Sequence, residues 1–141
     1  MGAYRRFDST ASTGGSAATV DVTLQLSNVD LLTSKPLNPM WLIRAVYVKC
    51  TRGGGGTPPT HYEVLIGETS GWTTDAQDQR YDNVETPHAE LVTDVLDGVP
   101  IKTDANGRVY VRFTGTDSSR SATGTGHSFE YTIDLESVPG S

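Results

Sequence analysis

The run at residues 40–51 constrains the fold of this chain more than any other stretch. It reads Met-Trp-Leu-Ile-Arg-Ala-Val-Tyr-Val-Lys-Cys-Thr, and its many β-branched and aromatic side chains favour a strand over a helix. Proline precedes the run and glycines 53–56 follow it, which is typical of a segment bounded by turns. Both faces are largely apolar up to Val48. We therefore predict a central strand that is covered on both sides or meets a partner on its outer face.

Alternating apolar and polar residues predict further strands, each with one buried face. The alternation is clearest at 19–27, 108–114 and 128–136, and a return strand is expected at 61–68. The simplest pairing joins 61–68 to the central strand as a long-looped hairpin. At least six strands with turns between them predict an all-β, single-domain antiparallel β-sandwich of the jelly-roll or immunoglobulin-like type.

Two side-chain expectations accompany this fold. Arg108 and Arg112 are expected to pair with carboxylates of the last strand, because both segments present their charges outward. The leucines of the loop before the central strand are expected to plug one end of the core. These are Leu31, Leu32 and Leu37.

Residues 1–18 are predicted to form an extended, flexible N-terminal arm, and residues 19–141 the sandwich domain. The Ser, Thr, Ala and Gly residues at 9–18 are too small and polar for their burial to offset their ordering entropy. Removing 2–16 is therefore expected to leave the folded core intact. The arm begins with aromatic and arginine side chains of the kind that anchor interfaces. The candidate interface residues are Tyr4, Arg5, Arg6 and Phe7.

The charge distribution favours protein partners over nucleic acid. The chain carries a net charge of -6, and residues 61–100 alone hold nine acidic residues against Arg80. Such an acidic middle disfavours a nucleic-acid surface. No run approaches the ~18 apolar residues of a membrane span. The single cysteine, Cys50, excludes an intrachain disulfide and is expected to be a buried thiol.

No catalytic or metal-binding pattern stands out, so we expect no enzyme activity, no cofactor and no metal. The histidines, His61, His88 and His127, lack a neighbouring nucleophile motif. The spacing of Asp75, Asp78 and Asp82 is similar to that of a calcium site, but the rest of the EF-hand pattern is absent.

The irregular segment 67–88 is a second candidate interface. It contains Trp72 and Tyr81, and long loops in compact domains usually serve a function or bind a partner. Three interpretations stay open. The rings bind protein, they bind a glycan as in a carbohydrate-binding module, or Trp72 belongs to the core.

Segments 41–51 and 101–136 resemble those of small virion accessory proteins of tailed bacteriophages. In the second, Val-Tyr-Val-Arg-Phe and Phe-Glu-Tyr-Thr-Ile-Asp-Leu-Glu frame a glycine-rich loop. The resemblance implies a non-enzymatic head decoration, or cement, protein, with neck or tail components as the alternative. Its expected partners are capsid subunits and its own copies, in a homo-oligomer. Its expected location is the capsid surface of the virion, after synthesis in the host cytoplasm.

Overall fold

The structure is a computed structural model, and it describes residues 3–13, 18–51, 61–67, 79–83, 90–92, 98, 100–116, 119 and 128–139. None of these residues lies in a helix long and apolar enough to cross a membrane. Their regular secondary structure consists of strands joined by turns and loops. The strands are β1 (Tyr4–Ser12), β2 (Thr19–Gln25), β3 (Met40–Thr51), β4 (His61–Gly67), β5 (Gln79–Asn83), β6 (Glu90–Val92), β7 (Pro100–Lys102), β8 (Arg108–Thr116) and β9 (Ser128–Ser137).

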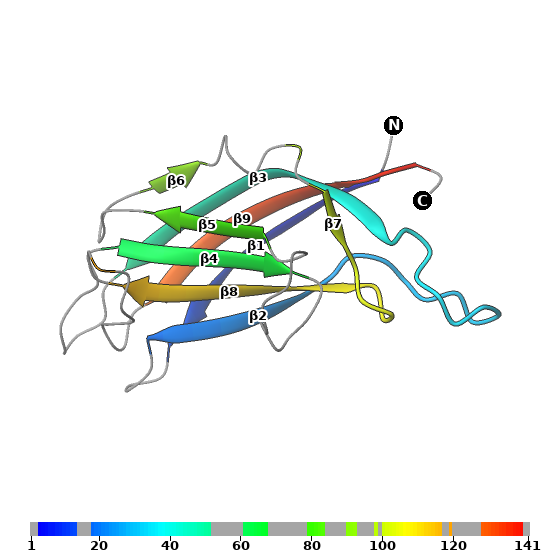
Figure 1. Ribbon diagram of the computed structural model, residues 1–141, viewed down its shortest axis with the longest axis horizontal. Helices are drawn as coiled ribbons and strands as arrows, with labels where there is room; N and C mark the ends of the chain where they lie inside the picture. The colour runs from blue at the N-terminus through cyan, green and yellow to red at the C-terminus, as the bar shows by residue number, and fades with distance from the viewer. Residues whose placement is uncertain are drawn as a thin grey trace.

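The strands form two antiparallel sheets that pack as a sandwich (Figure 1). One sheet has the order β1-β9-β3-β6, with β7 also paired to β3, and the other has the order β2-β8-β4-β5. The pairs are nested: β1 with β9, β2 with β8, β3 with β6 and β7, and β4 with β5. A hairpin wound across two sheets in this way is a jelly roll. In the immunoglobulin fold the first strand lies beside the second instead.

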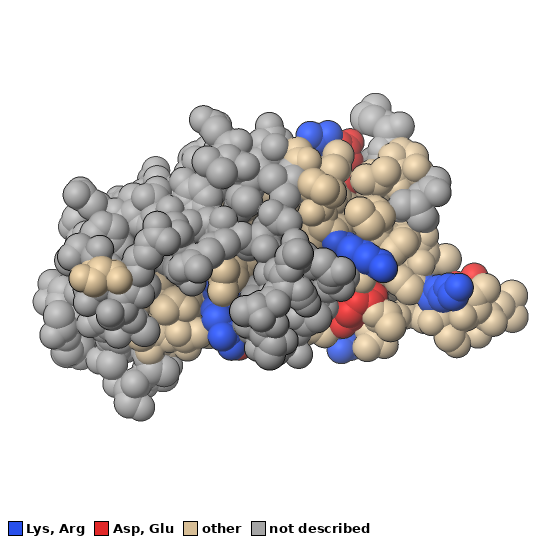
Figure 2. Space-filling model, viewed as in Figure 1, with Lys and Arg blue, Asp and Glu red and all other residues tan. Residues whose placement is uncertain are grey.

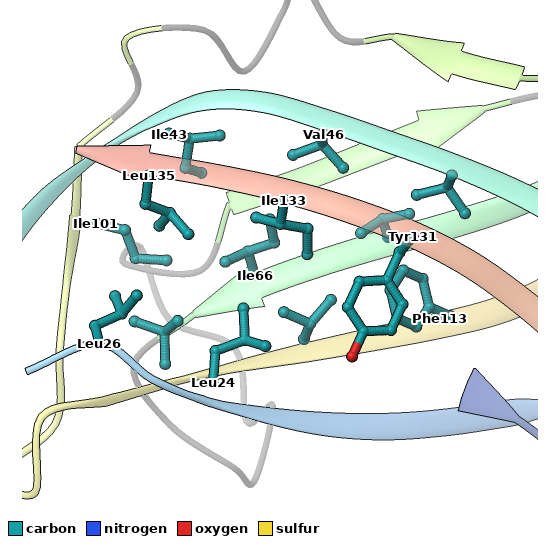
Figure 3. Close-up of a cluster of buried hydrophobic side chains, with 14 of the residues drawn as sticks. Leu24, Leu26, Ile43, Val46, Ile66, Ile101, Phe113, Tyr131, Ile133 and Leu135 are labelled. Carbon is teal, nitrogen blue, oxygen red and sulfur yellow. The ribbon is translucent and has the colours of Figure 1, made fainter. Parts of the chain in front are cut away.

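The core lies between the sheets, and the predicted alternation of β8 and β9 is confirmed there. Their inward residues Val109, Val111, Phe113, Phe129, Tyr131, Ile133 and Leu135 are all buried. Side chains of β2, β3, β4 and β7 meet them from the other strands (Figure 3). The Phe113 ring stacks on Phe129 and Tyr131, with centroids 5.3 Å and 5.2 Å apart, inside the range that aromatic pairs favour.

A β-bulge explains the apolar character of both faces of β3. The pairing with β9 shifts between Ile43 and Ala45, so Arg44 is the extra residue. A bulge reverses which face the following residues occupy. Trp41 and Ile43 are buried before it and Val46 and Val48 after it. The strand therefore turns its apolar residues to a single core, and the predicted cover on both faces is not needed to explain the pattern.

The predicted hairpin between the central strand and the next one is wrong. β3 pairs with β9, β6 and β7, whereas β4 lies in the other sheet between β8 and β5. Adjacent strands pair by default when a short turn joins them, and nine residues separate these two. Both β3 and β4 direct apolar side chains into the core from opposite layers, as Val46 and Val64 show.

The charge pairs also differ from the prediction, because β8 and β9 lie in different sheets. Arg112 pairs with Asp21 of β2, its Nε 2.7 Å from Oδ1. Glu136 of β9 pairs with Arg44, the bulge residue, at 2.9 Å.

The predicted free arm is wrong for residues 4–12. These form β1, which pairs with β9 over nine consecutive residues. The strand was not predicted because most of its side chains are exposed, so its sequence shows no apolar alternation. Its backbone bonds to β9 need no such pattern. Removing 2–16 would uncover β9, so the truncation is now expected to destabilise the fold.

Candidate interaction surface

The connection between β2 and β3 forms a narrow projecting loop that we call the finger (residues 28–37). It extends from the right-hand end of the sandwich in Figure 1. An isolated bridge joins Val29 to Pro36. Backbone hydrogen bonds brace the loop: Leu37 N–H to Asn28 O at 2.9 Å, Asp30 N–H to Lys35 O at 2.8 Å, and Ser34 N–H to Asp30 O at 2.8 Å.

The tip of the finger presents two leucines to solvent. Leu31 is 96% exposed and Leu32 is 94% exposed. The Asp30 carboxylate accepts a hydrogen bond from the Leu32 N–H at 2.8 Å, an Asx turn that fixes the backbone at the tip. Ser34 closes the turn at a φ of 56°. Single exposed apolar residues are ordinary, but two adjacent ones on a braced projection make the tip a candidate interaction site.

The base of the finger is held by the turn between β7 and β8. Leu26 N–H and Ser27 N–H both donate to the Gly107 carbonyl, at 2.9 Å and 3.1 Å. Gly107 has a φ of +76°, and a Cβ there would lie 2.1 Å from the Ser27 carbonyl oxygen. Glycine is therefore required both for the positive φ and for the close approach of the Ser27 carbonyl. Where the chain leaves the finger, Trp41 Nε1–H donates to Asn38 O at 2.6 Å.

A hollow of about 200 Å³ opens beside this base, and its lining includes the polar residues Ser27, Asn28 and Asn38 as well as apolar side chains. Leu26 and Trp41, both buried, contribute to it, as does Leu37, which is 54% exposed. Ala3 and Arg5 of β1 line it from the N-terminal side. The finger thus carries an exposed apolar tip at one end and a partly apolar hollow at the other.

The β7–β8 turn contains a carboxylate, Asp104, that accepts three hydrogen bonds. Burial raises the pKa of Asp104, but hydrogen bonds from Tyr110 Oη and from the N–H groups of Arg108 and Asn106 outweigh that effect and lower the pKa below its usual value. The Tyr110 hydroxyl donates to Asp104 Oδ2 at 2.5 Å, and this bond raises the pKa of Tyr110. The carboxylate therefore stays ionised and fixes the turn that supports the finger.

The four residues predicted as an anchor lie on β1 with different surroundings. Tyr4 is 57% exposed, and Phe7 packs against the core of its own chain. Arg5 Nη2 donates across to the Gln25 carbonyl of β2 at 3.2 Å. Arg6 makes a bidentate pair with Asp134 of β9, at 2.7 Å and 2.9 Å. Tyr4 is thus the ring of this group that faces solvent.

β1 is also an edge strand, since within the described chain it pairs on one side only. Ser137 N–H donates to Ala3 O at 2.8 Å, which places position 3 in a hydrogen-bonded pair. Bonded and non-bonded pairs alternate along an antiparallel ladder. The N–H and C=O groups of the even-numbered residues, from Tyr4 to Ser12, therefore point to the open edge.

Several predicted candidates lie outside what the structure describes. Trp72, Asp75, Asp78, His88 and His127 fall outside the described residues, and so do the side chains of Cys50, His61, Tyr81 and Asp82. The backbone of Tyr81 lies in β5, paired with Val64. Within the described ranges no group of three or more His, Cys, Asp or Glu residues could hold a metal ion.

Sequence reasoning missed the finger. Leu31, Leu32 and Leu37 were expected to plug the core, yet all three are among the exposed large hydrophobic residues. The available signal was local: Asp30 precedes the leucines as an Asx-turn residue, and Ser34 and Pro36 follow them. Those residues close a tight turn, and a tight turn holds its apolar side chains away from the core.

No family model matches the chain, and no curated protein sequence matches it. The comparison with solved structures does find matches. A structure of infectious bursal disease virus, Gx strain, aligns with a TM-score of 0.52 at 9% identity, over 99% of this chain and 32% of the other. This chain thus spans about a third of the viral chain's length, and the likeness shows the fold.

Weaker likenesses include proteins of other kinds. The infectious bursal disease virus VP2 subviral particle aligns with a TM-score of 0.43 at 9% identity, covering 94% of this chain and 32% of the other. The extracellular domain of ANXUR1 from Arabidopsis thaliana aligns with a TM-score of 0.42 at 10% identity, covering 92% and 31%. A jelly roll serves several functions, so a role has to be argued from the surface.

Proposed function

We propose that this chain is a non-enzymatic structural protein of a virus particle, a decoration or cement protein on the capsid surface of a tailed bacteriophage. It binds capsid subunits and its own copies and stabilises the head. Jelly rolls are common in viral capsid proteins, and the structure with a TM-score of 0.52 comes from a virus. The net charge of -6 favours protein over nucleic acid as the partner.

The open edge of β1 carries this proposal. It is nine residues long, its side chains are mostly exposed, and no described strand pairs with it on the side away from β9. Such an edge is a template for a strand of another chain, and strand addition is a common mode of protein recognition. Tyr4 and Arg6 stand on the same strand and add side-chain contacts. We assign the capsid contact to this edge.

The test is binding of the purified chain to decoration-free particles of the virus that encodes it. The wild-type chain should bind saturably and raise the temperature at which the particles disrupt. Thr10→Pro should abolish binding, because position 10 is even-numbered and its N–H points to the open edge.

Thr23→Pro is the matched control. Ala18 O accepts from Gly115 N–H at 2.9 Å, so by the same alternation Thr23 directs its N–H outward from β2, the edge of the other sheet. This variant should bind normally. Failure of the wild-type chain to bind particles would contradict the proposed function. Equal binding by Thr10→Pro and Thr23→Pro would show that the β1 edge does not make the capsid contact. A glycan-array signal with no particle binding would favour the carbohydrate-binding alternative.

A further inference from the structure

The finger carries two complementary features that the capsid contact does not use. Its tip exposes Leu31 and Leu32, and the hollow at its base is lined by Leu26, Leu37 and Trp41. Figure 2 shows the finger projecting at the right-hand end of the molecule, where most of its visible surface is uncharged. The tip lies at the end of the finger that is farthest from the two sheets (Figure 1).

We propose that the finger is a homodimer contact in which each copy inserts its tip into the hollow of the other. This deepens the part of the proposed function that concerns the chain's own copies, and it does not depend on capsid binding. The tip and the hollow lie at opposite ends of one finger. When two fingers lie antiparallel around a two-fold axis, the tip of each copy therefore occupies the hollow of the other. Such a reciprocal contact closes at two copies.

The dimensions and chemistry of the two features agree. The hollow, at about 200 Å³, exceeds the roughly 150 Å³ of an apolar cavity that takes up benzene. A leucine side chain has four carbons, fewer than benzene, so the hollow has room for it. Docking removes apolar surface of Leu31 and Leu32 from water on the tip and of Leu37 on the hollow side, since Leu26 and Trp41 are already buried.

Rigidity favours the contact, and the charge of the tip does not oppose it. Asp30 and Lys35 lie on the two arms of the finger and cancel, so the tip brings no net charge to the Arg5 that lines the hollow. The bridge, the Asx turn and the hydrogen bonds to Gly107 hold the finger in place. Little ordering entropy is therefore lost on docking. The contact is small and of the weak class, so the dimer should dissociate on dilution.

Sedimentation equilibrium of the isolated chain over a concentration series tests the proposal. The wild-type chain should show a reversible monomer–dimer equilibrium. The tip variant Leu31→Ser/Leu32→Ser should raise the dissociation constant about 30-fold or more, as loss of interface anchors does. Both leucines are almost fully exposed, so the fold should survive, and an unchanged melting temperature verifies this. Thr10→Pro, the β1-edge variant, should dimerise normally.

A mixing experiment separates this contact from any other dimer. The hollow variant Ala3→Trp places a large side chain where Ala3 lines the hollow and should also be monomeric. Mixed with the tip variant, it supplies one intact tip to one intact hollow and so restores one of the two contacts. Heterodimers should therefore form with a dissociation constant between that of the wild-type dimer and those of the two variants alone. A dimer that survives the tip substitution, or no heterodimer from two folded variants, overturns the proposal. Loss of the dimer in Thr10→Pro alone would assign self-association to the β1 edge instead. Particle binding is measured separately, so either proposal can fail alone.

Discussion

β1 and β9 are neighbours in one sheet, paired over nine residues, yet they are held by different forces. In β9 the inward side chains Phe129, Ile133 and Leu135 are fully buried. In β1 only Ala11 is buried, and Phe7 is partly so. Hydrogen bonds and the Arg6–Asp134 pair hold β1 in place. Pairing and burial are thus separate properties of a strand, and only burial leaves a pattern in the sequence.

The largest predicted effect comes from removing the burial that holds β9. Phe129→Ala should lower the free energy of unfolding by about 3–5 kcal/mol, since the ring is fully buried and stacked on Phe113. Phe7→Ala is the matched substitution on β1. It should lower the free energy of unfolding by clearly less, because that ring is only partly buried. Chemical denaturation of both variants measures the difference. Equal losses would show that β1 depends on burial as much as β9 does.

A smaller effect is expected from the ion pair that joins the two strands. The Asp134 side chain is 10% exposed, whereas Arg6 is 66% exposed. Arg6→Ala therefore leaves a largely covered carboxylate without its bidentate partner, and the melting temperature should fall by a few degrees.

The double variant Arg6→Ala/Asp134→Asn is the control for this pair. It should recover part of the loss, because removing both charges is milder than leaving one covered and unpaired. Thermal unfolding at pH 7 measures all three proteins. If both variants melt at the same temperature as the wild-type chain, the pair contributes nothing to the attachment of β1.

The distinction between strand pairing and side-chain burial also explains which features were predicted well from the sequence. The strands β2, β8 and β9 alternate, and the inward residues predicted for β8 and β9 are the buried ones, such as Phe113 and Ile133. The sandwich class follows from such strands. The choice of jelly roll over immunoglobulin-like fold required the pairing of β1 with β9. Alternation carries no information about which strands pair across a long loop.

The candidate surface was harder to predict for a related reason. Leu31 and Leu32 are apolar and were assigned to the core, but a turn closed by Asp30 and Ser34 holds them in solvent. The bulge at Arg44 likewise reverses the faces of β3, and no residue type marks it in advance. Position 107 is the exception, because a glycine after Asn106 already indicates a turn with positive φ.

The smallest predicted effect on stability concerns the backbone of β1 itself. Among the substitutions on β1, Thr10→Pro should lower the free energy of unfolding least, because it removes no hydrogen bond of the ladder. Thr10 is exposed, and its N–H points to the open edge, a position that tolerates proline. The next residue, Ala11, lies in a hydrogen-bonded pair, so Ala11→Pro removes a hydrogen bond between β1 and β9. This substitution should lower the free energy of unfolding several times more. Denaturation of the two variants measures this contrast. Equal and large losses would mean that the register of β1 on β9 differs from the one described. A small loss for Thr10→Pro would also establish that its failure to bind particles reflects the blocked edge and not an unfolded chain.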